Sequence, residues 1–216
     1  MRKDYLERYF VAGSQNFPEL TLSEYEARMQ EIMQSGITAY QFREKGAGLT
    51  DGPSRLALAQ RLQAYAQAAN VPFFIDDDVD LAIAIKADGI HVGQDDMPIT
   101  DVIARVPDEM VVGLSVRNLH EMQAAQTVAG LDYLGVGPIY ATTTKADAAE
   151  PLGLAGLQTV LTANTQELPT VGIGGITLAE LPTLHQAGLD GVAVISLLSA
   201  ASDVAAVITQ MKVQWG

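Results

Sequence analysis

The sequence predicts an α/β protein of the (β/α)8 TIM barrel class, and three observations agree on this. Eight short apolar runs alternate with stretches of helical periodicity along 216 residues, as is typical of a parallel sheet closed into a barrel. Three segments resemble one another: "KADGIHVG" (86–93), "AGLDYLGVG" (129–137) and "AGLDGVAVIS" (187–196). Each reads as a helix end, a turn with Asp and a short strand. An open doubly wound sheet is the alternative, but no GxGxxG motif follows the first strand.

The apolar runs give the expected strands in chain order. They are "YFVAG" from residue 9, "ITAYQFR" from 37, "VPFFID" from 71, "GIHVG" from 89, "MVVGLSV" from 110, "DYLGVG" from 132, "PTVGIGG" from 169 and "GVAVIS" from 191. Before the second strand, "TLSEYEARMQEIMQSG" predicts a helix with Ser23 as its N-cap and Gly36 as its stop. Two of the three similar segments carry Gly where a left-handed helix cap is easiest.

Composition predicts one compact domain over residues 1–216, because no Pro/Ser-rich or low-complexity linker divides the chain. Apolar residues make up 48% and charged residues 18%, enough for a sizeable core. The net charge of −13 disfavours nucleic acid or an anionic membrane as a partner, since both need a basic field. Small-molecule ligands are favoured, and homo-oligomerisation is left open.

The chain has no cysteine, which excludes disulfides, iron–sulfur clusters and thiolate zinc. Its opening, "MRKDYLERYF", is charged and lacks the apolar core of a signal peptide. The stretch "GVAVISLLSAAS" has twelve residues, fewer than the roughly 18 that span a bilayer. We therefore expect a cytoplasmic protein without a membrane span.

Carboxylates follow two neighbouring strands, at the barrel end where chemistry is usually found. Asp77 ends the third strand and Asp96 follows the fourth, so both can reach one point. Two carboxylates, completed by water and substrate phosphates, suit Mg²⁺. The alternative is that Asp76, Asp77 and Asp78 only cap the next helix. Spacing alone leaves both interpretations open.

The three histidines give little support for zinc, because His91, His120 and His185 have no ligand-like spacing. His120 and His185 are expected on helix surfaces. His91 is expected to pack inside a strand.

Basic residues gather after the strands although the protein is acidic: Arg43, Lys45, Arg117 and Lys145. Arg binds phosphate through paired donors and Lys supplies a point charge, so these residues indicate a phosphate-bearing ligand. Surface salt bridging is the alternative, with more weight for Arg117.

Glycine-rich backbone ends the last two strands, in "GIGG" (172–175) and "VIS" (194–196). Such backbone can approach an anion closely and offer N–H groups, as phosphate sites of barrels commonly do. Glycines also serve tight turns, but with Ser196 beside them a phosphate site is favoured.

Taken in this order, "QFREK", "DDVDLA…ADGIHVGQDD", "GPIYATTTKADA", "GIGGI" and "VIS" resemble the thiamin phosphate synthase family over residues 37 to 198. The resemblance implies a (β/α)8 barrel transferase of thiamin biosynthesis. Members join hydroxymethyl-aminopyrimidine pyrophosphate to thiazole phosphate and release pyrophosphate, with Mg²⁺.

The resemblance also implies roles for individual residues. Asp77 and Asp96 match the metal ligands. Arg43, Lys45, Lys145 and Ser115 match the catalytic positions around the pyrophosphate. The implied substrate-binding residues are Gln41, Arg43, Lys45, Asp76, Ser115, Thr142, Thr144, Lys145, Gly174, Gly175, Ile195 and Ser196, of which the last four and the two threonines match the cradle of the thiazole phosphate. Asp76 departs from the pattern, because the family usually shows Asn there.

The implied chemistry suits these residue types. Pyrophosphate on a methylene attached to an electron-rich aminopyrimidine can leave first, so the protein mainly neutralises departing charge and aligns two rings. Two alternatives remain: a thiazole tautomerase of the same barrel family and a non-catalytic sensor of thiamin phosphates. Asp96 together with "TTTK" favours the synthase over the tautomerase, and pyrophosphate release separates an enzyme from a sensor.

Overall fold

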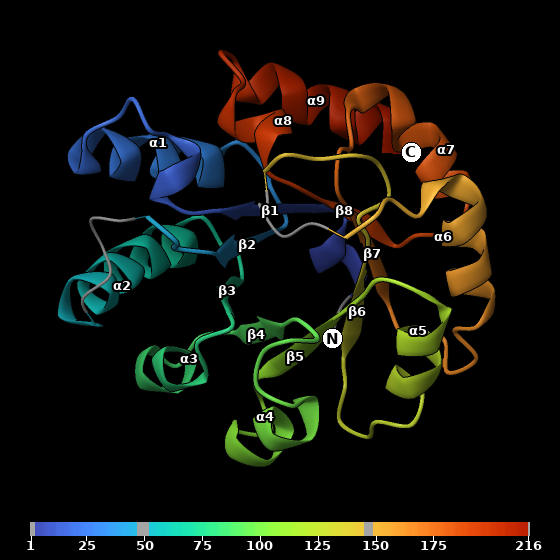
Figure 1. Ribbon diagram of the computed structural model, residues 1–216. Coiled ribbons are helices and arrows are strands. Elements are labelled where there is room, and N and C mark those ends of the chain that lie inside the picture. The colour runs from blue at the N-terminus through green and yellow to red at the C-terminus, as the bar shows by residue number, and fades with distance from the viewer. Residues whose placement is uncertain (1–2, 47–51, 145–148, 216) are drawn as a thin grey trace.

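The computed structural model is a closed barrel of parallel strands surrounded by helices (Figure 1). It describes residues 3–46, 52–144 and 149–215. The strands pair in chain order from β1 to β8, and β1 also pairs with β8 in parallel. This ring confirms the predicted (β/α)8 class and rules out an open doubly wound sheet.

Each strand overlaps one of the apolar runs in the sequence. The strands are β1 (Arg8–Ala12), β2 (Ala39–Phe42), β3 (Phe73–Asp76), β4 (Gly89–Val92), β5 (Val111–Val116), β6 (Tyr133–Val136), β7 (Thr170–Ile173) and β8 (Gly191–Val194). The helices are η1 (Lys3–Leu6), η2 (Ser14–Asn16), α1 (Leu22–Gln34), α2 (Gly52–Ala68), α3 (Val79–Ile85), α4 (Ile99–Arg105), α5 (Leu119–Ala125), α6 (Gly153–Thr162), η4 (Leu178–Glu180), α7 (Leu181–Gln186), α8 (Ser196–Ser199) and α9 (Val204–Trp215). Within the described ranges, no helix is both long and apolar enough to cross a membrane.

The core has two layers because side chains of a strand point alternately outward and inward. The outward-pointing residues pack under the helices in one large apolar cluster. A smaller cluster fills the barrel, where the Tyr9 ring lies 5.4 Å from Phe74 and 6.2 Å from Tyr133 between centroids. Leu6 of η1 belongs to this inner cluster and is fully buried. The barrel interior is therefore packed with side chains and is not an open channel.

The three similar sequence segments share one structural device. Each Asp directly precedes an even-numbered strand and pairs with one residue of the preceding strand. The Asp carboxylate accepts the backbone N–H of that residue, and the backbone N–H of the Asp donates to the carbonyl of the same residue. Thr38 pairs with Arg8 in the same way through its hydroxyl. The carboxylate pairs are Asp88 with Phe73, Asp132 with Val112 and Asp190 with Thr170, each at 2.8 Å. The repeat thus marks a strand-pairing clamp at the end where the strands begin.

The helix ends follow the expected cap chemistry with one correction. Gly130 and Gly188 have left-handed backbones, with φ of 88° and 98°, as predicted for the glycines of the similar segments. The N-cap of α1 is Thr21 and not Ser23, because Thr21 accepts the N–H of Glu24 and Glu24 reaches back to Thr21. This reciprocal capping box satisfies two backbone donors, which a start two residues later would leave unpaired.

We expect Asp132→Ala to lower the free energy of unfolding by about 1–3 kcal/mol, because the Val112 N–H loses its acceptor. Asp132→Asn also removes the charge but keeps an oxygen acceptor, so it should cost less than half as much. Denaturant unfolding of both variants measures the difference. Equal losses would show that the charge of Asp132, and not its hydrogen bond, stabilises the barrel.

Candidate active site

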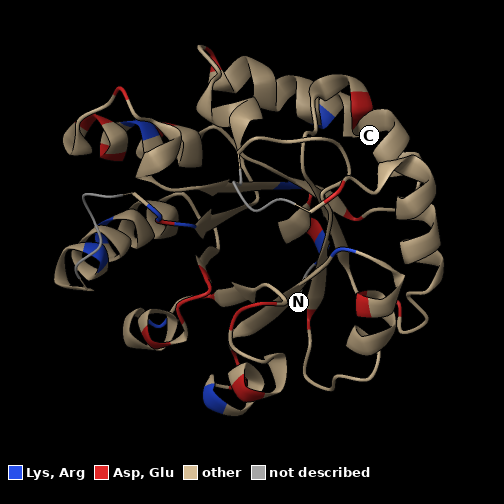
Figure 2. Cartoon of the chain, viewed as in Figure 1, with Lys and Arg blue, Asp and Glu red and all other residues tan. Residues whose placement is uncertain are grey.

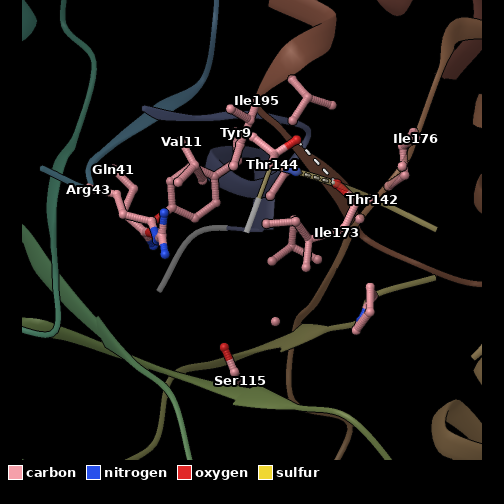
Figure 3. Close-up of a pocket in the computed structure, with 18 of the residues that line it drawn as sticks. Tyr9, Val11, Gln41, Arg43, Ser115, Thr142, Thr144, Ile173, Ile176 and Ile195 are labelled. Carbon is pink, nitrogen blue, oxygen red and sulfur yellow. Dashed lines mark hydrogen bonds between the residues drawn. The ribbon is translucent and has the colours of Figure 1, made fainter. Parts of the chain in front are cut away.

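A cavity opens at the carboxyl ends of the strands, and most of the sequence-predicted binding residues line it (Figure 3). Gln41 and Arg43 lie on one side of the view, Thr142 on the opposite side, and Ser115 on a further wall. Lys45 lies beside the cavity and not in its wall, and Lys145 lies outside the described residues. The predicted residues that line the cavity are Gln41, Arg43, Asp76, Ser115, Thr142, Thr144, Gly174, Gly175, Ile195 and Ser196.

Two cations and two carboxylates meet where β2 and β3 end. The Arg43 Nε is 3.3 Å from the Asp76 Oδ2, and the Lys45 Nζ is 2.8 Å from the Asp77 Oδ2 and 3.7 Å from the Asp76 Oδ2. Figure 2 shows blue segments in the loop after β2 and a red segment directly after β3. The side chains of Arg43 and Asp76 are only 17% and 10% exposed, so their pair is not an ordinary surface salt bridge.

The loop that carries both cations is held by two residues that the sequence analysis did not single out. Glu44 is buried, and its carboxylate accepts the N–H and hydroxyl of Ser14 and the N–H of Gly46. Gln15 donates to the Arg43 carbonyl at 2.7 Å and accepts the Lys45 N–H at 3.0 Å. The loop after β1 thus fixes the backbone on both sides of Glu44. The sequence feature that could have drawn attention to Glu44 is its position between two cations in "QFREK".

Asp77 and Asp96 come within hydrogen-bonding reach of each other although they follow different strands. Burial and the hydrogen bond with Asp77 raise the pKa of Asp96. Burial opposes ionisation of Asp77 too, but its hydrogen bonds with Asp96 and Lys45 lower the pKa of Asp77. Two carboxylates this close favour either a shared proton or a cation between them.

Asp76 and Asp78 have different surroundings from Asp77. Burial, with the charge of Asp77 as a smaller cause, raises the pKa of Asp76 to about 7. Asp78 is the N-cap of α3, where its Oδ1 accepts the Leu81 N–H at 3.0 Å. The capping alternative therefore describes Asp78. Asp77 has a left-handed backbone, with φ of 64°, and precedes the cap.

The far wall is built where the end of β7 approaches the loop after β6. Gly174 and Gly175 have φ of 100° and 64°, and an added Cβ would lie 2.5 Å from the Pro138 Cβ and 2.4 Å from the Ala141 carbonyl oxygen, respectively. Only glycine fits both positions. Beside them, the Thr142 hydroxyl donates to the Thr144 hydroxyl at 3.2 Å (Figure 3). Among the described residues, this wall offers backbone N–H groups and hydroxyls but no charged side chain.

His91 and Arg117 differ from their simplest sequence interpretations. His91 does not merely pack in its strand: it lines the cavity, with its Nε2 2.8 Å from the Ser115 Oγ. Arg117 also lines the cavity, yet it pairs with Asp95 at 2.9 Å and Glu121 at 3.1 Å, as the salt-bridge alternative expected. The other two histidines are exposed on α5 and α7.

Comparison with known proteins places this geometry in a family. A family model described as thiamine monophosphate synthase matches residues 8–198. The chain is 49% identical to the thiamine-phosphate synthase of Lactococcus lactis subsp. cremoris over 92% of its length and 89% of the relative's. It is 47% identical to that of Lactiplantibacillus plantarum, over 95% of this chain and 93% of the relative.

Solved structures agree with the sequence relatives. The thiamine phosphate pyrophosphorylase from Pyrococcus furiosus superposes with a TM-score of 0.84 at 30% identity, covering 99% of this chain and 96% of that one. A 3-hexulose-6-phosphate synthase from Salmonella typhimurium, 18% identical with a TM-score of 0.69 over 96% of this chain and 99% of that one, shares the fold alone. The chain belongs to the thiamine monophosphate synthase family.

Proposed function

We propose that this transferase joins the aminopyrimidine-methyl group of hydroxymethylpyrimidine pyrophosphate to thiazole phosphate and releases pyrophosphate. The observation that carries the proposal is a pair of unlike anion sites on opposite sides of the cavity, one of which extends beyond the cavity wall to Lys45, Asp77 and Asp96. One, at the ends of β2 to β4, combines Arg43 and Lys45 with a carboxylate pair. The other, at the ends of β6 to β8, consists of glycine backbone and the hydroxyls of Thr and Ser side chains. Two phosphorylated substrates need two such sites.

The leaving group is assigned to the cationic side. The bond between the methylene carbon and the pyrophosphate oxygen breaks, and its electron pair departs with the pyrophosphate. Arg43 and Lys45 neutralise that charge, Arg43 by a planar fork and Lys45 as a point charge. Lys145, by its resemblance to the family position, adds a further cation from the loop after β6.

The carboxylate pair fits Mg²⁺ better than a protein-only metal cage. Among the residues that the structure describes, no group of three or more His, Cys, Asp or Glu side chains could hold a metal ion. Mg²⁺ typically uses one or two carboxylates and completes its shell with water and phosphate oxygens, which matches Asp77 and Asp96. When bound there, the ion would supply positive charge for the pyrophosphate oxygens.

The thiazole phosphate, which carries the nucleophile, is assigned to the glycine-rich site at the ends of β6 to β8. Backbone N–H groups near Gly174, Gly175 and Ser196, with the hydroxyls of Thr142 and Thr144, hold the thiazole phosphate. The thiazole nitrogen then forms a bond to the methylene carbon with its lone pair. That nitrogen carries no proton, so the step needs no general base, and alignment of the two rings supplies much of the acceleration.

We expect Asp76→Asn to lower KM for the pyrimidine pyrophosphate about fivefold, since Asp76 competes with the substrate for Arg43 and Lys45 and relief of that competition is expected to contribute about 1 kcal/mol in total. Asn keeps the shape and adds a donor for a phosphate oxygen. Initial rates at several fixed Mg²⁺ concentrations measure the change. A higher KM in the variant would identify Asp76 as a participant in metal binding instead.

Pyrophosphate release tests the proposed function directly. Purified protein is mixed with both substrates and Mg²⁺, and pyrophosphate and the coupled thiamin phosphate are measured together. Each substrate alone is the control, because the transfer must yield both products in equal amounts. The runner-up, a thiazole tautomerase, would rearrange a thiazole precursor without releasing pyrophosphate. If the mixture of both substrates and Mg²⁺ yields no pyrophosphate, the synthase assignment is overturned.

A further inference from the structure

A chain of hydrogen bonds runs through the barrel interior and joins two walls of the cavity. The Gln41 Nε2 donates to the Tyr9 hydroxyl at 3.1 Å, and the Tyr9 and Tyr133 hydroxyl oxygens are 3.1 Å apart. The Tyr133 hydroxyl lies 3.0 Å from the His91 Nδ1, and the His91 Nε2 lies 2.8 Å from the Ser115 Oγ. Both ends, Gln41 and Ser115, face the cavity (Figure 3).

The middle of the chain is closed to solvent. Tyr133 is fully buried and does not line the cavity, and Tyr9 is 1% exposed. Burial raises the pKa of both phenols, so each keeps one proton that it can donate. A buried hydroxyl needs partners for its oxygen and its proton, because water cannot replace them.

These requirements give the chain a direction. Because the Tyr9 oxygen accepts from the Gln41 amide, its proton points to Tyr133. The Tyr133 proton then points to the His91 Nδ1, which must be the bare nitrogen of a neutral imidazole. His91 carries its proton on Nε2 and donates it to the Ser115 oxygen. The proton of Ser115 is left to point into the cavity.

We propose that Tyr9, Tyr133 and His91 are positioning residues that fix Ser115 as a hydrogen-bond donor to an acceptor atom of the pyrimidine pyrophosphate. This role rests on the proposed function. If the Gln41 amide were rotated, every bond in the chain would reverse with the heavy atoms in place, and Ser115 would present an acceptor. The direction of the chain therefore decides which kind of substrate atom Ser115 can recognise.

The tautomer of His91 tests the direction without any substrate. Nitrogen NMR of protein labelled with ¹⁵N-histidine separates a protonated ring nitrogen from a bare one. The sequence has three histidines, so the signal missing from His91→Gln assigns His91. We expect a proton on Nε2 and none on Nδ1. A proton on Nδ1, alone or together with one on Nε2, would overturn the proposal.

Tyr133→Phe tests the coupling to catalysis. The variant removes the hydroxyl but keeps the ring that packs on Phe74 and His91. We expect His91 to lose its single tautomer and kcat to fall about tenfold, as for one lost hydrogen bond, with KM for thiazole phosphate unchanged. Tyr25→Phe is the matched control. Tyr25 lies on α1, outside the barrel, and is buried to the same degree as Tyr133. Its hydroxyl also has a tyrosine partner, since it lies 3.4 Å from the Tyr40 hydroxyl. An unchanged tautomer and rate in Tyr133→Phe would contradict the proposal.

A double-mutant cycle separates positioning from general support of the fold. If Tyr133 acts through Ser115, adding Tyr133→Phe to Ser115→Ala costs no further activity. Additive losses would mean that Tyr133 only stabilises the barrel, which would overturn the proposed role. The two assignments fail separately: wild-type protein that releases no pyrophosphate refutes the proposed function, whereas the tautomer and its dependence on Tyr133 decide the direction of the chain by themselves.

Discussion

Asp96→Ala is expected to lower kcat/KM for pyrophosphate release about a hundredfold or more, and Asp77→Ala should do the same. Removing a group that acts on developing charge typically has an effect of this size. In the substrate-free protein Asp96 is exposed, so the hydrogen bond between Asp96 and Asp77 contributes little to the stability of the fold. The free energy of unfolding should therefore change by less than about 1 kcal/mol, although the Gly93 N–H loses its Asp96 acceptor.

The neighbouring Asp95→Ala is the matched control. Asp95 is exposed and pairs with Arg117 at 2.9 Å, so its loss should change kcat/KM less than about threefold, as for an exposed ion pair. Titrating Mg²⁺ adds a second readout, since a weakened site should need more metal for half-maximal rate. A wild-type rate and a wild-type Mg²⁺ requirement in Asp96→Ala would refute the ligand assignment.

Arg43→Ala is expected to reduce kcat about a hundredfold, because it removes the fork proposed to neutralise the leaving group. Arg43→Lys keeps the charge but loses the paired donors, so it should recover only part of that loss. Steady-state rates with both substrates varied show whether the loss falls on kcat, as expected for an interaction made in the transition state.

A second variant excludes an indirect explanation. Arg43 is the closest cation to the buried Asp76, so Arg43→Ala also leaves that carboxylate poorly compensated. The double variant Arg43→Ala/Asp76→Asn removes this problem. It should stay nearly as slow as Arg43→Ala, and full recovery would show that Arg43 only serves Asp76. Arg61→Ala is the control for loss of an arginine away from the cavity, because Arg61 on α2 pairs with Glu26 on α1. It should leave kcat unchanged.

Much of the candidate site could be placed from the sequence because a parallel barrel puts every strand's carboxyl end on one face. That rule, together with the family resemblance, predicts that Arg43, Asp76 and Gly174 lie on one face of the barrel, and all three line the cavity there. The roles of these residues, and the extent of a single domain over residues 1–216, stay predictions. The Ser23 cap was wrong because a nearby Thr21 has Glu24 at the spacing of a capping box.

Glu44 and Gln15 could not be found in the same way. Their partners belong to loops after different strands, with Ser14 and Glu44 30 positions apart. An acid between two cations is also what an exposed loop would show. Only its burial and its three donors distinguish Glu44 from a solvated side chain.

The sequence by itself predicted a barrel of alternating strands and helices and the face that carries the polar residues, because periodicity and Asp-containing turns are local signals; closure of the ring then excluded an open sheet. The tertiary structure alone decided which inward-facing side chains meet. Tyr9 and Tyr133 are 124 positions apart, and His91 and Tyr133 are 42 apart. No local pattern relates such residues: closure of the ring brings their strands around one axis, and burial there then requires every hydroxyl and imidazole nitrogen to find a partner.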